Sequence, residues 1–212
     1  MLATGVYSGS PNERLMGLSN GYHDVPPGKL AAVQTFLEMR ARPTLRTARN
    51  EPSWRVERFA PVDLERYFAL FHRVGDEHLW TLRLQMPCEE VVQLLGDPQY
   101  QTFVLVTSGG DEGLLELDFR VAGECEVSLF GVAPELVGSG AGRVLMNYGI
   151  EVAWSHPIER FWLHTCTLDH PKAMAFYERS GFVPYKRAIE IFDDPRTLGL
   201  TRRDAANAVP IF

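Results

Sequence analysis

The sequence predicts an α+β fold in which helices flank one mixed, mostly antiparallel and twisted sheet. Three apolar segments in the middle of the chain are separated only by short turns rich in Gly, Ser and Asp, which is typical of antiparallel hairpins. Segments with helical spacing alternate with apolar runs in the last third of the chain. This order predicts a helical connection to a strand that lies parallel to the last hairpin strand. A length of 212 residues suits a single domain.

The expected elements follow from local patterns along the chain. Apolar residues after a Pro-Pro-Gly turn predict the first strand, and helical spacing before a Gly-Asp-Pro break predicts two helices. Gly181 follows a helical segment at a position that suits the positive φ of a helix end. We expect strands at residues 30–39, 102–107, 113–121, 125–132, 160–166 and 182–191, and helices at 61–74, 89–95, 142–156 and 171–180.

Composition excludes several classes of protein. Hydrophobic residues form 45% of the chain and charged residues 23%, as in globular proteins and unlike disordered ones. A net charge of −6 gives no basic field for a phosphate backbone, so we expect no nucleic-acid partner. Without a secretory signal or an apolar run of the roughly 18 residues that span a bilayer, we expect a cytoplasmic protein with no membrane partner. The spacing of Cys88, Cys125 and Cys166 predicts reduced thiols without a disulfide.

The two ends differ from the middle of the chain. We expect an N-terminal arm at residues 1–27, one domain at 28–192 and a C-terminal tail at 193–212 that holds at most one short helix. Residues 40–54 carry several arginines and two prolines, which indicates a solvated basic loop.

The most informative segment is a glycine-rich turn between a predicted strand and a predicted helix, with Gly138, Gly140 and Gly142. Such glycines let the main chain approach a ligand closely, and the free N–H groups of the first helical turn favour a pyrophosphate. A P-loop would end in Gly-Lys-Ser/Thr, whereas Arg143 and Val144 follow here. A dinucleotide fold would place the turn after an early parallel strand. Taken alone, the turn fits a tight packing loop equally well.

The residues before and within this turn follow the pattern of a known family. Val132, Pro134 and Glu135 match a strand that ends in Val-x-Pro-Glu. Gly140 and Gly142 match the glycines of the pattern Arg/Gln-x-x-Gly-x-Gly/Ala that follows it. The segment therefore resembles the acetyl-coenzyme A loop of the GCN5-related N-acetyltransferase (GNAT) superfamily.

A second segment, at residues 170–182, resembles that superfamily's Asn-x-x-Ala-x-x-x-Tyr-x-x-x-Gly-Phe helix. Ala173 and Tyr177 stand at its Ala and Tyr positions, while His170 replaces the Asn. In the first segment, Val137 replaces the Arg or Gln. Both segments occur in the expected order, about thirty residues apart with a helix and a strand between them, so the pair is far more specific than either alone.

The resemblance implies a GNAT-like fold and acetyl-CoA as the cofactor. It places a gap between the strands at 125–132 and 160–166, filled by the thioester arm of the cofactor. The cofactor-binding residues that it implies are Val132, Val137, Gly138, Ser139, Gly140, Ala141, Gly142, Arg143, His170 and Ala173. Of these, Val132 contributes its main-chain N–H for the carbonyl and the developing oxyanion.

The resemblance also suggests catalytic residues. Tyr177 stands at the general-acid position, where its phenol donates a proton to the departing thiolate. Glu126 lies eleven residues before Val137, at the spacing of the catalytic Glu in histone-type members. The alternatives for the base are Glu116 or Asp118 on the preceding strand, with water or His164 as further options; they stay open at this stage.

The alternation of side chains along the strand at 125–132 indicates where the candidate base Glu126 points. It predicts one face of the strand at 125–132 with Glu126, Ser128 and Phe130, and an opposite, apolar face with Cys125, Val127 and Leu129. Glu126 would then point to solvent or to an acceptor cleft.

The expected activity is transfer of an acetyl group to a primary amine by direct attack in a ternary complex. A cluster of Glu116, Asp118 and Glu126 favours a cationic acceptor. The identity of the acceptor and the oligomeric state of the protein stay open. The alternatives are a non-catalytic module that binds acyl-CoA, or an enzyme that transfers a longer acyl group. We expect no metal, since His164 and His170 with the nearby cysteine match no zinc signature.

Overall fold

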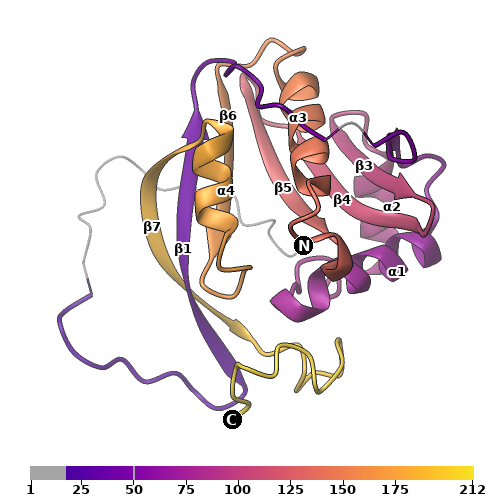
Figure 1. The fold of residues 1–212 in the computed structure, drawn as a ribbon. Helices are drawn as coiled ribbons and strands as arrows, with labels where there is room; N and C mark the ends of the chain where they lie inside the picture. The colour runs from indigo at the N-terminus through magenta and orange to yellow at the C-terminus, as the bar shows by residue number, and fades with distance from the viewer. Residues whose placement is uncertain (1–17, 50) are drawn as a thin grey trace.

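The computed structural model describes residues 18–49 and 51–212 and has the predicted α+β architecture (Figure 1). Most of the expected N-terminal arm, residues 1–17, lies outside the described residues. The strands are β1 (Lys29–Met39), β2 (Arg55–Arg58), β3 (Tyr100–Thr107), β4 (Gly110–Asp118), β5 (Glu124–Val132), β6 (Arg160–Cys166) and β7 (Val183–Asp193). The helices are α1 (Leu64–Gly75), α2 (Cys88–Gly96), α3 (Ala141–Ala153) and α4 (Ala173–Ser180), with 3-10 turns at Asp76–His78 and Pro134–Leu136.

The strands form one mixed sheet in the order β2-β3-β4-β5-β6-β1-β7. All neighbours are antiparallel except β5 and β6, the parallel pair that the sequence predicts. Two features were not predicted. Strand β2 directly follows the basic loop, and β1 lies between β6 and β7, although it comes first in the chain.

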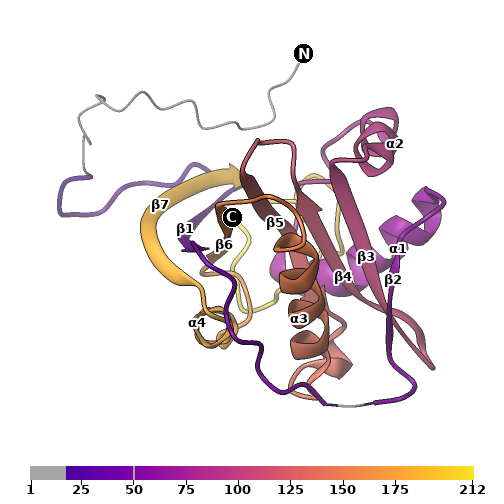
Figure 2. The same ribbon diagram turned by 90° about the horizontal axis from the view of Figure 1, so that it is seen from above.

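Helices cover both faces of the sheet (Figure 2). Tyr67 of α1 and Val91 of α2 pack in one buried cluster, which Leu114 of β4 joins. Leu145 of α3 and Tyr177 of α4 belong to a second cluster on the opposite face. The sheet therefore separates an α1/α2 face from an α3/α4 face. Within the described residues, no helix is long and apolar enough to cross a membrane.

A β-bulge in β5 corrects the predicted alternation. The register with β4 shifts between the pairs Glu116–Leu129 and Leu117–Val127, which leaves Ser128 as the extra residue. As a result Val127 packs in the cluster on the α3/α4 face, while Leu129 packs on the α1/α2 face. The expectation that Cys125, Val127 and Leu129 share one face was therefore wrong, because an inserted residue reverses the alternation. Phe130 accordingly packs with the α3/α4 cluster.

Strands β5 and β6 pair only at their beginnings. The parallel ladder covers Glu124 to Glu126 of β5 against Arg160 to Trp162 of β6 and then stops. Beyond Glu126 the two strands separate, and the main-chain groups on the facing edges lose their ladder partners. This is the splayed sheet that the resemblance implied.

The C-terminal segment folds back over the domain in turns, without the short helix considered above. Its turns are held together by the buried ion pair of Arg196 with Asp194, which joins Nη2 to Oδ2 at 2.7 Å. The same guanidinium donates to main-chain carbonyls, including that of Val209 at 2.8 Å. Ala205 is fully buried against Leu30 of β1. The segment is thus part of the domain's packing.

We expect the substitution Arg196→Met to lower the free energy of unfolding by roughly 3 kcal/mol, because it leaves the buried carboxylate of Asp194 without its partner. Arg202→Met is the matched control, since Arg202 is exposed and solvent screens its pairs with Asp76 and Glu77. Urea unfolding of both variants measures the difference. Equal losses would contradict the role of Arg196 in holding the turns of this segment together.

Candidate functional site

A cleft of about 2150 Å³ follows the split between β5 and β6. The glycine turn and the N-terminal ends of α3 and α4 line one part of it. The segment 78–87 after α1, together with β1 and β7, lines another part. Residues far apart in the sequence therefore meet in one cavity.

The glycine turn presents free N–H groups to this cleft. The N–H groups of Gly138, Gly140 and Gly142 donate to no acceptor among the described residues. In contrast, the N–H of Ala141 donates to the Ser139 hydroxyl at 3.2 Å, and that hydroxyl donates to a main-chain carbonyl at 2.6 Å. Three unpaired donors at the N-terminus of a 13-residue helix form a cradle for an anion.

The backbone of the turn explains its glycines. Gly138 has φ of +83° and Gly140 has φ of +102°, in the region that residues with a Cβ rarely adopt. A Cβ on Gly138 would meet no protein atom within 4 Å and would project into open space. The residues present therefore fit a bound pyrophosphate. Val137, at the position where the family has Arg or Gln, is 44% exposed and offers no polar side chain.

Four cations surround this part of the cleft: Arg46, Arg143, Lys172 and Arg179. Within residues 18–49 and 51–212 none of them forms an ion pair with a carboxylate. Burial, together with the charges of Arg46 and Arg179, lowers the pKa of Arg143. Cations that repel one another are suited to phosphate groups.

Sequence reasoning identified only Arg143 of these cations. The side chain of Arg143 donates to the Ser180 hydroxyl at 2.8 Å and lies over the Phe176 ring, so α4 holds it in place. Arg46 was missed because the basic loop looked solvated. Its main-chain carbonyl accepts a bond from Asn147 of α3 at 2.7 Å, and this contact brings the loop to the cleft.

The other predicted cofactor residues also lie at the cleft or beside it. The N–H of Ala133 donates to the main-chain carbonyl of Glu112 on β4 at 2.8 Å. Because successive N–H groups of a strand point to opposite edges, the N–H of Val132 points away from β4 and toward the gap. His170 precedes α4, and its Nδ1 accepts the N–H of Lys172 at 3.1 Å. The helix begins at Ala173, later than predicted, because residues 171–172 form a turn.

Tyr177 projects from α4 into a set of aromatic rings, with the ring of Phe130 at 6.1 Å and that of Phe182 at 6.2 Å. It is 8% exposed, and burial, with a contribution from Asp169, raises its pKa. The hydroxyl donates to no described residue, yet it is not a fully buried polar atom. It therefore reaches the cleft with its proton in place.

Glu126 stands at the last paired position before the split, between Asp118 of β4 and Trp162 of β6. Because its neighbours on β5 pack on the α3/α4 face, its side chain lies on the opposite face, in the cleft. Burial, with the charge of Asp118 as the next cause, raises the pKa of Glu126 to about 7. The carboxylate is thus poised to exchange a proton near neutral pH.

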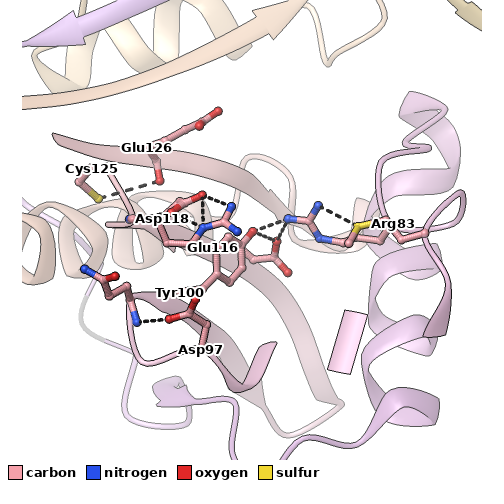
Figure 3. A network of polar contacts seen from close by, with 10 residues as sticks. Arg83, Asp97, Tyr100, Glu116, Asp118, Cys125 and Glu126 are labelled. Carbon is pink, nitrogen blue, oxygen red and sulfur yellow. Dashed lines mark hydrogen bonds and ion pairs between the residues drawn. The ribbon is translucent and has the colours of Figure 1, made fainter. Parts of the chain in front are cut away.

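Glu116, considered above as a base and as part of an acidic cluster, lies in the core. It is fully buried and accepts the hydroxyl proton of Tyr67 at 2.6 Å. It also accepts the hydroxyl proton of Tyr100 at 2.5 Å and lies 2.8 Å from Arg83 Nη2 (Figure 3). Figure 3 shows the Glu126 carboxylate directed away from this network. The sequence could not reveal this, because Arg83 and Tyr67 are distant in the chain. Glu116 is therefore excluded as the base.

Two further candidates lie in the cleft. Asp118 is held by Arg120, with Nη2 and Oδ2 2.6 Å apart. His164 lies on β6 on the face shared by Trp162 and Glu126. No group of three or more His, Cys, Asp or Glu side chains within the described residues could hold a metal ion. All three cysteines are free; Cys88 is exposed and Cys125 buried.

Comparison with solved structures finds the same fold in several proteins. A GNAT-family protein from Novosphingobium aromaticivorans matches with a TM-score of 0.55 and 17% identity over 79% of this chain and 67% of that one. A GCN5-related N-acetyltransferase from Sphaerobacter thermophilus matches with a TM-score of 0.54 and 16% identity, over 80% of this chain and 53% of that one. The ribosomal-protein-S18-alanine N-acetyltransferase of Escherichia coli matches with a TM-score of 0.51 and 17% identity, over 66% of this chain and 94% of that one. The chain thus spans about half to two-thirds of the length of the first two.

Curated protein sequences give no match. The model of the family described as acetyltransferase (GNAT) family matches residues 62–182, which include the glycine turn and Tyr177 and make up more than half of the sequence. The chain therefore belongs to the GNAT acetyltransferase family.

Proposed function

We propose that the protein is an acetyl-CoA-dependent N-acetyltransferase that acetylates a primary amine by direct attack in a ternary complex. The observation that carries this proposal is the cradle of three unpaired N–H groups at Gly138, Gly140 and Gly142, beside the split strands. Acetyl-CoA, when bound, supplies the activated acetyl group. Arg143, with the other cations around the turn, would hold its phosphates.

Three groups of the chain have distinct roles in this proposal. The N–H of Val132 orients the acyl carbonyl and stabilises negative charge on its oxygen. Tyr177 keeps its proton at neutral pH, since its pKa is raised, and donates it to the leaving sulfur. Glu126 accepts a proton from the bound ammonium, either directly or through water, and so frees the amine lone pair that attacks the acyl carbon. No covalent enzyme intermediate is needed, and Cys166 takes no part.

The proposed acceptor is a cationic primary amine. Glu116 contributes nothing to its recognition, because its charge is neutralised inside the core. The carboxylates that line the cleft include those of Asp118, Glu126 and Glu190. They favour an ammonium over a neutral hydroxyl group.

A second candidate is a module that binds acyl-CoA without catalysis, which the exposed, apolar Val137 favours. Calorimetry with acetyl-CoA, combined with a thiol-release assay across a panel of amines, separates the two. Cofactor binding without release of free thiol on any amine would support the module and overturn the enzyme.

The substitution Gly138→Ala should weaken coenzyme A binding at least tenfold, because its Cβ would project into the space of the cradle. Gly123→Ala is the matched control: Gly123 also has a positive φ and open space around it, but it lies in the β4–β5 turn. Each variant should lose about 1 kcal/mol of stability to backbone strain. Calorimetry that shows equal affinities for coenzyme A in both variants would contradict the assignment of the glycine turn as the phosphate-binding site.

Tyr177→Phe should lower kcat by roughly ten- to a thousandfold and leave the Kd for acetyl-CoA unchanged, because only the phenolic proton is lost. Tyr148→Phe, a change of the same type on α3 where the ring packs on Phe103, is the control. Steady-state kinetics with a responsive amine measures both. Wild-type turnover in the Tyr177 variant would remove the acid role.

Glu126→Gln should abolish the rise of kcat/KM with pH around pH 7, because the group that titrates there is gone. The same variant should be more stable than the wild type above pH 7. A raised pKa in the folded state means that ionisation costs folding free energy as pH rises from about 4.5 to 7.

The gain in stability should be roughly 1–2 kcal/mol after allowance for solvent screening. Glu124→Gln on the same strand is the control, since Glu124 is paired with Arg160. An unchanged pH profile in the Glu126 variant would leave water as the base.

A further inference from the structure

A chain of three polar side chains crosses β7, β1 and β6 in the wall of the cleft. Gln34 Nε2 of β1 donates to Glu190 Oε2 of β7 at 2.5 Å. Gln34 Oε1 lies 3.1 Å from Nδ1 of His164 on β6. All three residues line the cleft, and Gln34 is only 7% exposed. The buried amide of Gln34 thus links two exposed side chains, His164 and Glu190, in the wall.

The chemistry of these groups determines the tautomer of His164. A carboxylate such as that of Glu190 only accepts, so the Gln34 amide must turn its nitrogen toward it. The amide oxygen then faces His164, and an oxygen can only accept. Nδ1 must therefore carry a proton. In the neutral imidazole this leaves Nε2 with a lone pair, as a hydrogen-bond acceptor.

The surroundings favour the neutral imidazole. Desolvation lowers the pKa of His164, although the charges of Glu190 on β7 and Asp169 after β6 oppose this. On its own strand Cys166 is a thiol whose pKa burial raises. The ring of Phe36 on β1 packs against the imidazole, with ring centroids 5.5 Å apart, and Lys186 Nζ of β7 lies over the Phe36 ring, 4.8 Å from its centroid. Although His164 is exposed, the net lowering of its pKa favours the neutral ring at neutral pH.

The position of His164 relates it to Glu126. Phe161 and Leu163 of β6 pack on the α3/α4 face, so Trp162 and His164 lie on the opposite face. Glu126 shares that face and pairs with Trp162 across the ladder. His164 follows Trp162 by two residues, beyond the point where the strands separate. The two groups therefore stand on either side of the split.

We propose that His164 binds the acceptor amine through Nε2, which accepts an N–H of the amine, and that Gln34 and Glu190 are positioning residues that hold it in this tautomer. This deepens the proposed function and rests on it for the identity of the site. An amine held in this way needs an N–H donor, which a primary ammonium has and a quaternary one lacks.

The first experiment measures the tautomer by long-range ¹⁵N–¹H NMR on the full chain labelled with ¹⁵N-histidine, at about pH 8. The wild type should show His164 with Nδ1 protonated and Nε2 unprotonated. Glu190→Gln should shift the Nε2 resonance toward its protonated value, because an amide at 190 can donate or accept and no longer orients Gln34. Glu190 is exposed, so this variant should fold. Glu90→Gln, the same change at an exposed cleft residue on α2, should leave the spectrum unchanged.

The second experiment titrates the labelled protein with benzylamine, n-butylamine and benzyltrimethylammonium, which has no N–H. The two primary amines should move the Nε2 resonance of His164, whereas the quaternary ion should not. In kinetics, Glu190→Gln should raise the KM for the amine at least fivefold and keep the KM for acetyl-CoA within twofold.

The outcomes separate this inference from the proposed function. A wild-type His164 with Nε2 protonated overturns the inference. An Nε2 resonance that does not shift when the primary amines are added also overturns it. Normal turnover with an unchanged amine KM in the Glu190 variant overturns the inference alone. If no amine is acetylated, the proposed function fails, and the tautomer and the titration still decide whether His164 binds amines.

Discussion

The separation of β5 from β6 after Glu126 is the constraint on which the site depends. A sheet normally satisfies its own main-chain groups, and here the facing edges of two adjacent strands are left without partners. The bulge at Ser128 accompanies this separation, because an extra residue bends a strand and disrupts its ladder. It also changes which side chains face each side, so Glu126 points into the cleft while Phe130 packs beside Tyr177. One local irregularity thus arranges the candidate base and the surroundings of the candidate acid.

The wall opposite the split is held by a buried polar network. Arg83 comes from the segment between α1 and α2, and its guanidinium reaches Glu116 in the centre of the sheet, beside Tyr100 (Figure 3). Tyr67 completes the contacts of Glu116. A buried charge pair of this kind contributes little net stability but requires one geometry. It therefore fixes the segment that carries Trp80 and Leu82 along the cleft.

Local pattern was enough to predict most of the elements and the glycine turn. The hairpins, α3 and the positive φ of Gly181 are set by neighbouring residues, so their signals lie in short stretches of sequence. Strand β2 has only four residues and leaves little periodicity to detect. The core position of Glu116 and the approach of Arg46 to the cleft depend on contacts between distant segments, which one sequence does not reveal. The bulge at Ser128 carries no local signal, and it reversed the predicted face of Leu129.

The position of β1 between β6 and β7 affects how the protein folds. Its Gln34 pairs with Cys166 of β6 and Ala188 of β7, both more than a hundred residues later in the chain. Contacts this distant close only after the intervening chain is available, and they slow folding. During synthesis the first strand must wait for the last one to emerge from the ribosome. Until then, β1 lacks its neighbours β6 and β7, and the cleft lacks a wall.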